Sequence, residues 1–122
     1  MGLIARSVLV VLEAAQEWST YMAKKRIPQN LQECLEQLER KLAPDELENI
    51  KNHSEKDLFL LHFGLGMWIR NNWRLWEDSA LTEWFRERGI DFADDISEVI
   101  VKCFWRYLNG MPVDTEKPNE YR

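Results

Sequence analysis

Apolar residues recur at steps of three and four along most of this chain, which is the spacing of amphipathic α-helices. The first such stretch covers residues 3–25 and ends before Pro28. A second helix is predicted after Asn30, a residue suited to capping a helix N-terminus. Its apolar stripe consists of Leu31, Cys34, Leu35, Leu38 and Leu42. Pro44 then opens a short third helix, because proline is tolerated in a first helical turn.

Residues 55–72 differ from the other segments, because their apolar side chains fall on every side of the predicted helix. A helix that is apolar all round is typically buried. Gly64 and Gly66 interrupt the segment, and each costs about 1 kcal/mol relative to alanine. Such glycines usually mark a close approach by a neighbour or a local break. We therefore expect residues 55–72 to form the buried central helix of the fold.

Residues 73–122 are predicted to form two more helices and a tail. Asp78 or Ser79 caps a short helix that ends near Gly89. The last long helix has the most regular stripe, formed by Ile96, Val99, Ile100, Cys103, Phe104 and Tyr107. Asn109 and Gly110 end it. Residues 111–122 form a polar C-terminal tail, and the sequence leaves open whether this tail is ordered.

These elements predict an all-α protein. At 122 residues the chain has room for one core. The chain has only five glycines and four prolines, and this scarcity argues against an all-β chain with many tight turns. We expect a compact single-domain bundle of five or six helices around the helix at 55–72. The domain spans residues 1–110, with an N-terminal helix at 1–26 and a core at 27–110.

The net charge of the chain and the length of its apolar runs exclude some classes of partner and location. A net charge of −5 argues against a protein that binds nucleic acid by neutralising phosphates. No stretch approaches the roughly 18 uncharged apolar residues of a membrane span. The apolar run that begins at Val8 ends at Glu13, which is too short for a secretory signal. We expect a cytoplasmic protein without membrane or nucleic-acid partners.

The sequence contains no motif typical of a catalytic site or a metal-binding site. The two histidines, His53 and His62, are nine residues apart and have no cysteines nearby to complete a metal site. Cys34 and Cys103 lie on apolar stripes and are interpreted as small buried hydrophobes. We predict no catalytic residue, no metal and no cofactor, and the sequence leans away from an enzyme.

One polar cluster remains as a candidate binding site, with aromatic side chains around it. Its polar members are His62, Arg70, Asn71, Asn72, Asp94 and Asp95, and its aromatic lining is Trp68, Trp73 and Trp76. A structural interpretation fits the same residues: a histidine bound to a carbonyl group, an arginine paired with an aspartate, and asparagines that cap a helix end. Asp94 and Asp95 could likewise lie at a helix N-terminus, pair with Arg70, or face a basic partner.

A second candidate surface is acidic. It consists of Glu33, Glu36, Glu39, Asp45, Glu46 and Glu48 on the second and third predicted helices. The simplest interpretation is a solvated helix face. If these carboxylates have a function, it is electrostatic steering of a basic partner.

The segment His62-Phe63-Gly64-Leu65-Gly66-Met67-Trp68-Ile69-Arg70-Asn71-Asn72-Trp73-Arg74-Leu75-Trp76 resembles the signature of an uncharacterised bacterial family, domain of unknown function 6794. The likeness extends from Ile27-Pro28 to Leu108-Asn109. Arg74 stands where a small residue is expected, and Phe92-Ala93 where His-Pro is typical. The resemblance implies a bacterial source and assigns no activity.

Two hypotheses about function follow. The first is a non-enzymatic protein-binding module, in its most concrete form an immunity- or antitoxin-type protein whose acidic surface occludes a basic toxin or effector domain. The alternative is a small enzyme or ligand-binding domain with a polar site at His62, Arg70, Asn71 and Asp95. The sequence does not define an oligomeric state.

Overall fold

The computed structural model describes residue 15 and residues 26–122 of the chain. Within these residues the fold is helical and contains no strand, so the predicted all-α class is confirmed. Between residues 26 and 122 the α-helices are α2 (Leu31–Lys41), α3 (Pro44–Lys51), α4 (Met67–Asn72), α5 (Ala80–Arg86) and α6 (Ala93–Leu108). Three further helical elements are not α-helical: the 3₁₀-helix η1 (Glu55–Leu61), the π-helix η2 (His62–Gly66) and the 3₁₀-helix η3 (Pro118–Tyr121). Almost all of the predicted N-terminal helix, 1–26, lies outside the described residues.

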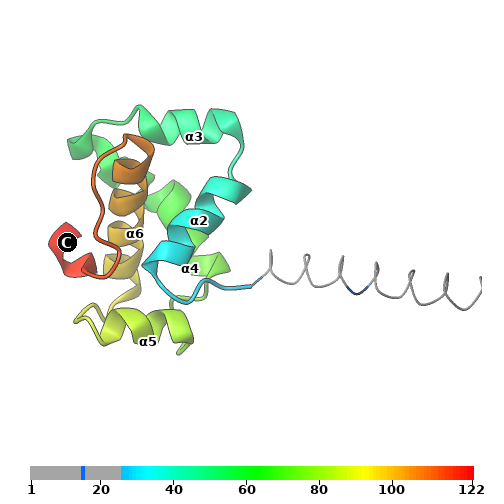
Figure 1. The fold of residues 1–122 in the computed structure, drawn as a ribbon, viewed down its shortest axis with the longest axis vertical. Helices are drawn as coiled ribbons and strands as arrows, with labels where there is room; N and C mark the ends of the chain where they lie inside the picture. Colours follow the sequence, from blue (N-terminus) through cyan, green and yellow to red (C-terminus); the bar gives the residue numbers. More distant parts are fainter. Residues whose placement is uncertain (1–14, 16–25) are drawn as a thin grey trace, which may run out of the picture.

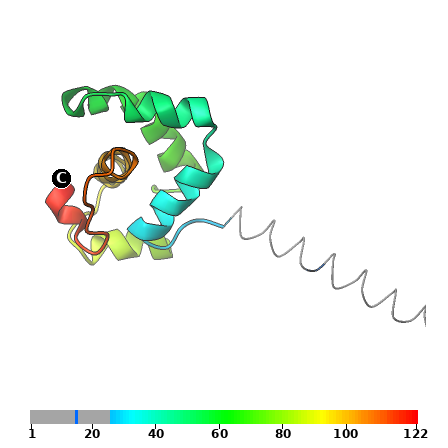
Figure 2. The same ribbon diagram turned by 45° about the horizontal axis from the view of Figure 1, so that its top comes forward.

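The central element is α6, and the other helices surround it. Figure 2 looks nearly along α6 and shows α2, α3, the 55–72 segment, α5 and the C-terminal segment arranged around it. Its buried stripe is the one that the spacing predicts, with Ile96, Val99, Ile100, Cys103 and Phe104 in the core. Tyr107, the last residue of the predicted stripe, is instead exposed and donates a hydrogen bond to Glu39 on α2.

The segment at 55–72 is helical but is not the all-round buried helix that its composition predicts. It consists of η1, η2 and α4 in succession, so its helical geometry changes twice. Leu61, Ile69 and Arg70 face the core. The opposite side is open: Phe59 is 69% exposed, Leu60 58%, Phe63 77% and Met67 42%. The physical reason is that α6 occupies the centre, so a surrounding helix is covered on one side only.

The ends of the helices follow the local signals in the sequence. The Asn30 side chain caps α2 by accepting a hydrogen bond from Glu33 N at 2.9 Å. Ser79, rather than Asp78, caps α5 by accepting from Thr82 N. Gly89 and Gly110 have φ values of 85° and 69°, a left-handed conformation that glycine adopts without steric cost. None of the described helices is long and apolar enough to cross a membrane.

The C-terminal tail folds back along α6 (Figure 1). Arg106 donates to the Pro112 carbonyl, and Pro118 at the start of η3 is fully buried. Asn119 donates to the Arg88 carbonyl, and Arg122 pairs with Asp95 in the first turn of α6. Residues 111–122 are polar in composition and nevertheless form an ordered segment, because a buried proline and hydrogen bonds between side chains and backbone carbonyls hold them in place.

Candidate functional site

The predicted polar cluster is organised around Arg70, whose side chain is only 4% exposed. Its Nη2 donates to the His62 carbonyl at 2.9 Å, and its Nη1 donates to Ser97 Oγ at 2.9 Å. Its Nε lies 3.5 Å from Asp94 Oδ1. Arg70 thus links the π-helix η2, its own helix α4 and the first turns of α6. A buried guanidinium requires such partners, because an unpaired buried charge is strongly unfavourable.

Gly66 makes this position of Arg70 possible. A Cβ atom at residue 66 would lie 3.1 Å from Arg70 Nη1 and 3.3 Å from the Leu61 carbonyl oxygen. Gly66 is therefore a glycine of close approach, one of the two explanations that the sequence offers. Gly64 is different, because a Cβ atom there would meet nothing within 4 Å. Packing inside the described part of the chain does not require glycine at residue 64.

The two asparagines lie at the end of α4, away from Arg70. Asn72 Nδ2 donates to the Trp68 carbonyl at 2.9 Å, and Trp76 Nε1 donates to Asn71 Oδ1 at 3.4 Å. Both asparagines are exposed. Their position matches the structural interpretation, in which these side chains bind groups at a helix end.

The three predicted lining tryptophans do not form one wall. Trp73 is buried in the core and meets the half-buried Trp68 edge to face, with ring centroids 5.8 Å apart. Trp76 is exposed. None of the three contributes to the cavity described next.

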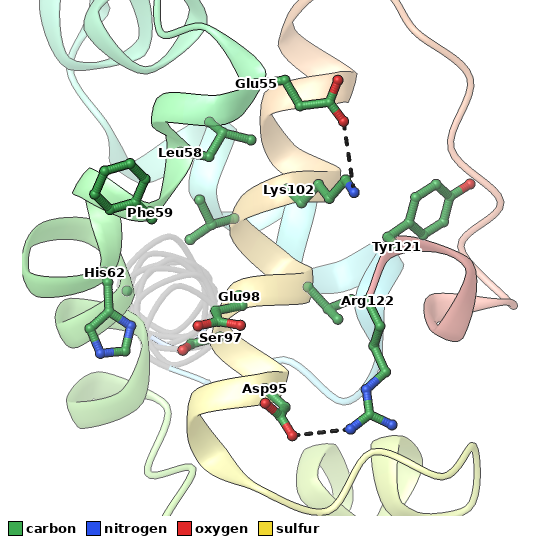
Figure 3. A pocket seen from close by; sticks show the side chains of 13 residues that line it. Glu55, Leu58, Phe59, His62, Asp95, Ser97, Glu98, Lys102, Tyr121 and Arg122 are labelled. Carbon is green, nitrogen blue, oxygen red and sulfur yellow. Dashed lines mark hydrogen bonds and ion pairs between the residues drawn. The ribbon is translucent and has the colours of Figure 1, made fainter.

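A cavity of about 330 Å³ lies along α6, between the η1–η2 segment and the C-terminal residues (Figure 3). We call it the α6 cavity. Its lining residues come from three parts of the fold: Glu55, Leu58, Phe59, His62 and Gly66; then Asp95, Ser97, Glu98, Val99, Val101 and Lys102; then Tyr121 and Arg122. The volume lies near the lower end of the range of small-molecule pockets, about 300–1,000 Å³.

An ion pair lies at each end of the α6 cavity (Figure 3). Lys102 Nζ lies 3.7 Å from Glu55 Oε1 at one end, and Arg122 Nη2 lies 3.1 Å from Asp95 Oδ2 at the other. Glu98 lies on α6 between these two pairs. Within the part of the chain that the structure describes, its carboxylate forms neither an ion pair nor a hydrogen bond.

The structure divides the predicted polar site between two places. His62 and Asp95 line the α6 cavity, whereas Arg70 lies behind it in the core. Asp94 reaches Arg70 from the surface, and Asn71 and Asn72 lie at the far end of α4. Both aspartates belong to the first turn of α6, where the helix dipole favours a carboxylate.

Sequence reasoning missed most of the cavity. The spacing of Asp95, Glu98 and Lys102 on one face of the last long helix could have indicated its floor. No comparable signal places Tyr121 and Arg122 there, because their positions depend on how the tail folds back.

Comparison with known families matches residues 27–108 to a domain of unknown function, DUF6794. The chain belongs to this family. The comparisons with curated proteins and with solved structures found no match. The DUF6794 region runs from just before α2 to the end of α6, so it contains Arg70 and its partners as well as Glu98. Tyr121 and Arg122, which form one wall of the α6 cavity, lie beyond it.

The predicted acidic surface of this DUF6794 domain spans α2 and α3. Five of its six members are exposed, and Glu33 is partly buried and lies 3.5 Å from Arg26. Glu36, Glu46 and Glu48 accept hydrogen bonds from residues close in sequence, and Glu39 accepts one from Tyr107. Most carboxylates of the acidic surface therefore already form a hydrogen bond or an ion pair within the protein.

The two cysteines are buried in the core, as their stripes predict. Burial raises the pKa of the Cys103 thiol to about 12, and burial also raises the pKa of Cys34 well above its ordinary value. The thiolate is the reactive form of cysteine, so neither side chain is arranged as a nucleophile. Among the described residues, no group of three potential ligands is placed to hold a metal ion.

Proposed function

We propose that this protein is a non-enzymatic protein-binding module that occludes a basic partner domain, in the manner of an immunity- or antitoxin-type protein. The observation that carries this proposal is the exposed apolar face of the η1–η2–α4 segment. This face consists of Phe59, Leu60, Phe63, Gly64 and Met67. We call it the 59–67 face.

The 59–67 face is apolar without being needed for the core. Soluble proteins rarely expose a contiguous group of large apolar side chains unless a partner covers it. Aromatic residues and methionine are also the types enriched in protein interfaces. Gly64 lies among these large side chains with open space at its Cβ position, so a partner can approach the backbone there. The π-helical geometry of η2 adds support, because π-helical turns are frequent at functional sites.

The charge of the chain indicates the chemistry of the partner. With a net charge of −5, the protein attracts a basic surface and repels an acidic one. Asp45 and Glu46 in the first turn of α3, together with the glutamates of α2, supply carboxylates for this attraction. Such charges act mainly on the rate of association and on the choice of partner. The apolar contact then supplies most of the affinity.

Arg70 and His62 have structural roles in this proposal. Arg70 holds η2 against α6 through the His62 carbonyl and Ser97. His62→Ala removes the imidazole, whose Nδ1 lies 3.4 Å from Arg70 Nη1, so we expect it to affect partner binding only through a loss of stability. The rival hypothesis needs His62, Arg70, Asn71 and Asp95 at one site, and the structure brings only His62 and Asp95 to the α6 cavity.

The test begins with the genes next to the one that encodes this chain. A neighbouring gene for a basic toxin or effector domain supplies the partner, whose binding is measured by isothermal titration calorimetry. We expect Phe63→Ser and Leu60→Ser to weaken binding at least tenfold without loss of folding. Phe92→Ser is the matched control, because Phe92 is also exposed but lies outside the 59–67 face.

The charge part of the proposal has its own test. Glu36→Lys combined with Asp45→Lys should slow association, and the effect should shrink as salt is added, because salt screens exposed charges. The proposal fails if no basic toxin or effector is encoded nearby and the purified protein captures no basic partner. It also fails if Phe63→Ser and Phe92→Ser bind the partner equally well.

A further inference from the structure

We propose that the α6 cavity receives one basic side chain of the partner, an arginine by preference, with its guanidinium group on Glu98. This inference rests on the proposed function, because the basic domain supplies the side chain. It adds a second contact, which adjoins the 59–67 face at Phe59, and assigns a role to a cavity that the predicted polar site explains only in part.

The charged groups that line the cavity leave one carboxylate, that of Glu98, unpaired among the described residues, and Glu98 is exposed, so a partner can reach it. Three carboxylates line it, those of Glu55, Asp95 and Glu98, against the two cations Lys102 and Arg122. Each of these cations lies within 4 Å of one carboxylate, Lys102 at Glu55 and Arg122 at Asp95. Glu98 is left between the two pairs. A single positive charge placed there would give every acidic group of the cavity a partner.

The walls of the cavity suit the stem of a long basic side chain. Leu58, Phe59 and Val99 provide apolar surface close to the carboxylates. Arginine and lysine commonly lay their methylene groups along such surface while the charged end reaches a polar group. A cavity of about 330 Å³ is also nearer in size to one long side chain than to a large cofactor.

The protein's own Arg122 shows that a guanidinium group pairs with a carboxylate at the wall of this cavity. Its Nη2 lies 3.1 Å from Asp95 Oδ2, and Asp95 precedes Glu98 by about one turn of α6. Phe59 adds an aromatic ring to the same cavity. A planar guanidinium can pair with a carboxylate through two N–H groups and can stack on an aromatic ring, whereas an ammonium group lacks this flat shape. Arginine is therefore favoured over lysine.

Phe59 connects the cavity to the proposed interface. It belongs to the exposed 59–67 face and also lines the α6 cavity. A partner that covers the face therefore lies at the edge of the cavity, where a side chain can enter it. Figure 3 shows Glu98 extending from α6 towards the side on which Phe59 and His62 lie.

The first experiment uses the isolated protein and a small probe. N-acetyl-arginine methylamide is titrated into the full-length chain while backbone amide shifts are followed by NMR. We expect saturable shifts at Glu98, Val99 and Phe59, with weaker effects for N-acetyl-lysine methylamide. N-acetyl-norleucine methylamide, which keeps the stem and lacks the charge, is the control for apolar contact alone.

Variants then test the role of Glu98. Glu98→Gln keeps the shape and removes the charge, and it should weaken arginine-probe binding at least fivefold. Glu77→Gln removes the same charge from an exposed glutamate that lies outside both the α6 cavity and the acidic surface, and it should leave binding unchanged. Thermal unfolding of both variants checks that the fold is retained. The inference is overturned if the norleucine probe gives the same shifts, or if the two glutamine variants bind the arginine probe equally.

Titration with the basic partner separates this inference from the proposed function. If Phe63→Ser abolishes partner binding and Glu98→Gln leaves it unchanged, the proposed function stands and the cavity inference is wrong. If both variants weaken binding, both stand. If the arginine probe binds at Glu98 but no basic domain binds the protein, Glu98 remains a guanidinium site and the assignment to a partner side chain is overturned.

Discussion

The guanidinium group of Arg70 lies against the backbone of Gly66, so closely that a Cβ atom at residue 66 would lie 3.1 Å from Nη1. This contact links two residues of the central motif that the sequence shows only as neighbours four positions apart. It lets a buried cation reach the His62 carbonyl and Ser97, and so attaches η2 to α6. The segment from His62 to Trp76 therefore serves in large part to position η2 against α6, while its outward residues Phe63, Gly64 and Met67 belong to the 59–67 face.

Gly66→Ala should destabilise the protein by about 1–2 kcal/mol, because the added methyl group meets a guanidinium held by its partners and a backbone oxygen. Gly64→Ala is the matched control. It meets nothing within 4 Å and should raise stability by about 0.5–1 kcal/mol through helix propensity. Urea unfolding of the two variants measures both effects. Equal stabilities would contradict this account of Gly66.

Ser97→Ala should lower the free energy of unfolding by about 1–3 kcal/mol, because it removes the hydroxyl group that accepts a hydrogen bond from the buried Arg70 Nη1. Arg70→Lys should lower the stability at least as much, because one ammonium group cannot replace a guanidinium group whose two Nη atoms reach two different acceptors. Asp94→Asn serves as the comparison. Asp94 is 61% exposed, so its loss should cost less than that of Ser97. Chemical denaturation of the three variants would refute this order if Asp94→Asn proved the most damaging.

Arg74→Gly should stabilise the protein by about 1 kcal/mol. Arg74 has a φ of 51°, a left-handed conformation that is unfavourable for residues other than glycine. Arg74→Ala removes the side chain and keeps the strain, so it should change stability little. A thermal melt in which alanine stabilises as much as glycine would exclude this explanation.

Neither cysteine should react in the folded protein. Because burial raises the thiol pKa, to about 12 for Cys103, the thiolate fraction lies below that of a free cysteine at every pH up to that range. At about pH 8, Ellman's reagent should modify both thiols rapidly only after denaturant is added. Fast modification of either thiol in native buffer would show that the core opens more readily than the structure indicates.

The helices at the two ends of the described core could be predicted because their apolar stripes are regular. The stripe from Leu31 to Leu38 and that from Ile96 to Phe104 are both buried as the spacing requires. Local signals were also sufficient for helix ends, as at Asn30, because a cap depends on residues that are adjacent in sequence.

The segment at 55–72 was misjudged for a physical reason. Its apolar side chains are spread over every side, and composition does not say which sides other helices will cover. Coverage depends on where α6 lies, and α6 takes the centre. A helix buried on every side would place Phe59, Leu60 and Phe63 in the core, and the structure leaves them at the surface.

The sequence by itself determined that the described chain is all-α and where its regular helices begin and end. Those properties depend on side-chain spacing and on contacts within a few residues. Only the tertiary structure decided that Arg70 supports the fold, and that Asp95, Glu98 and Arg122 share a cavity. Such relationships join residues far apart in the chain, so they depend on how whole helices and the tail pack.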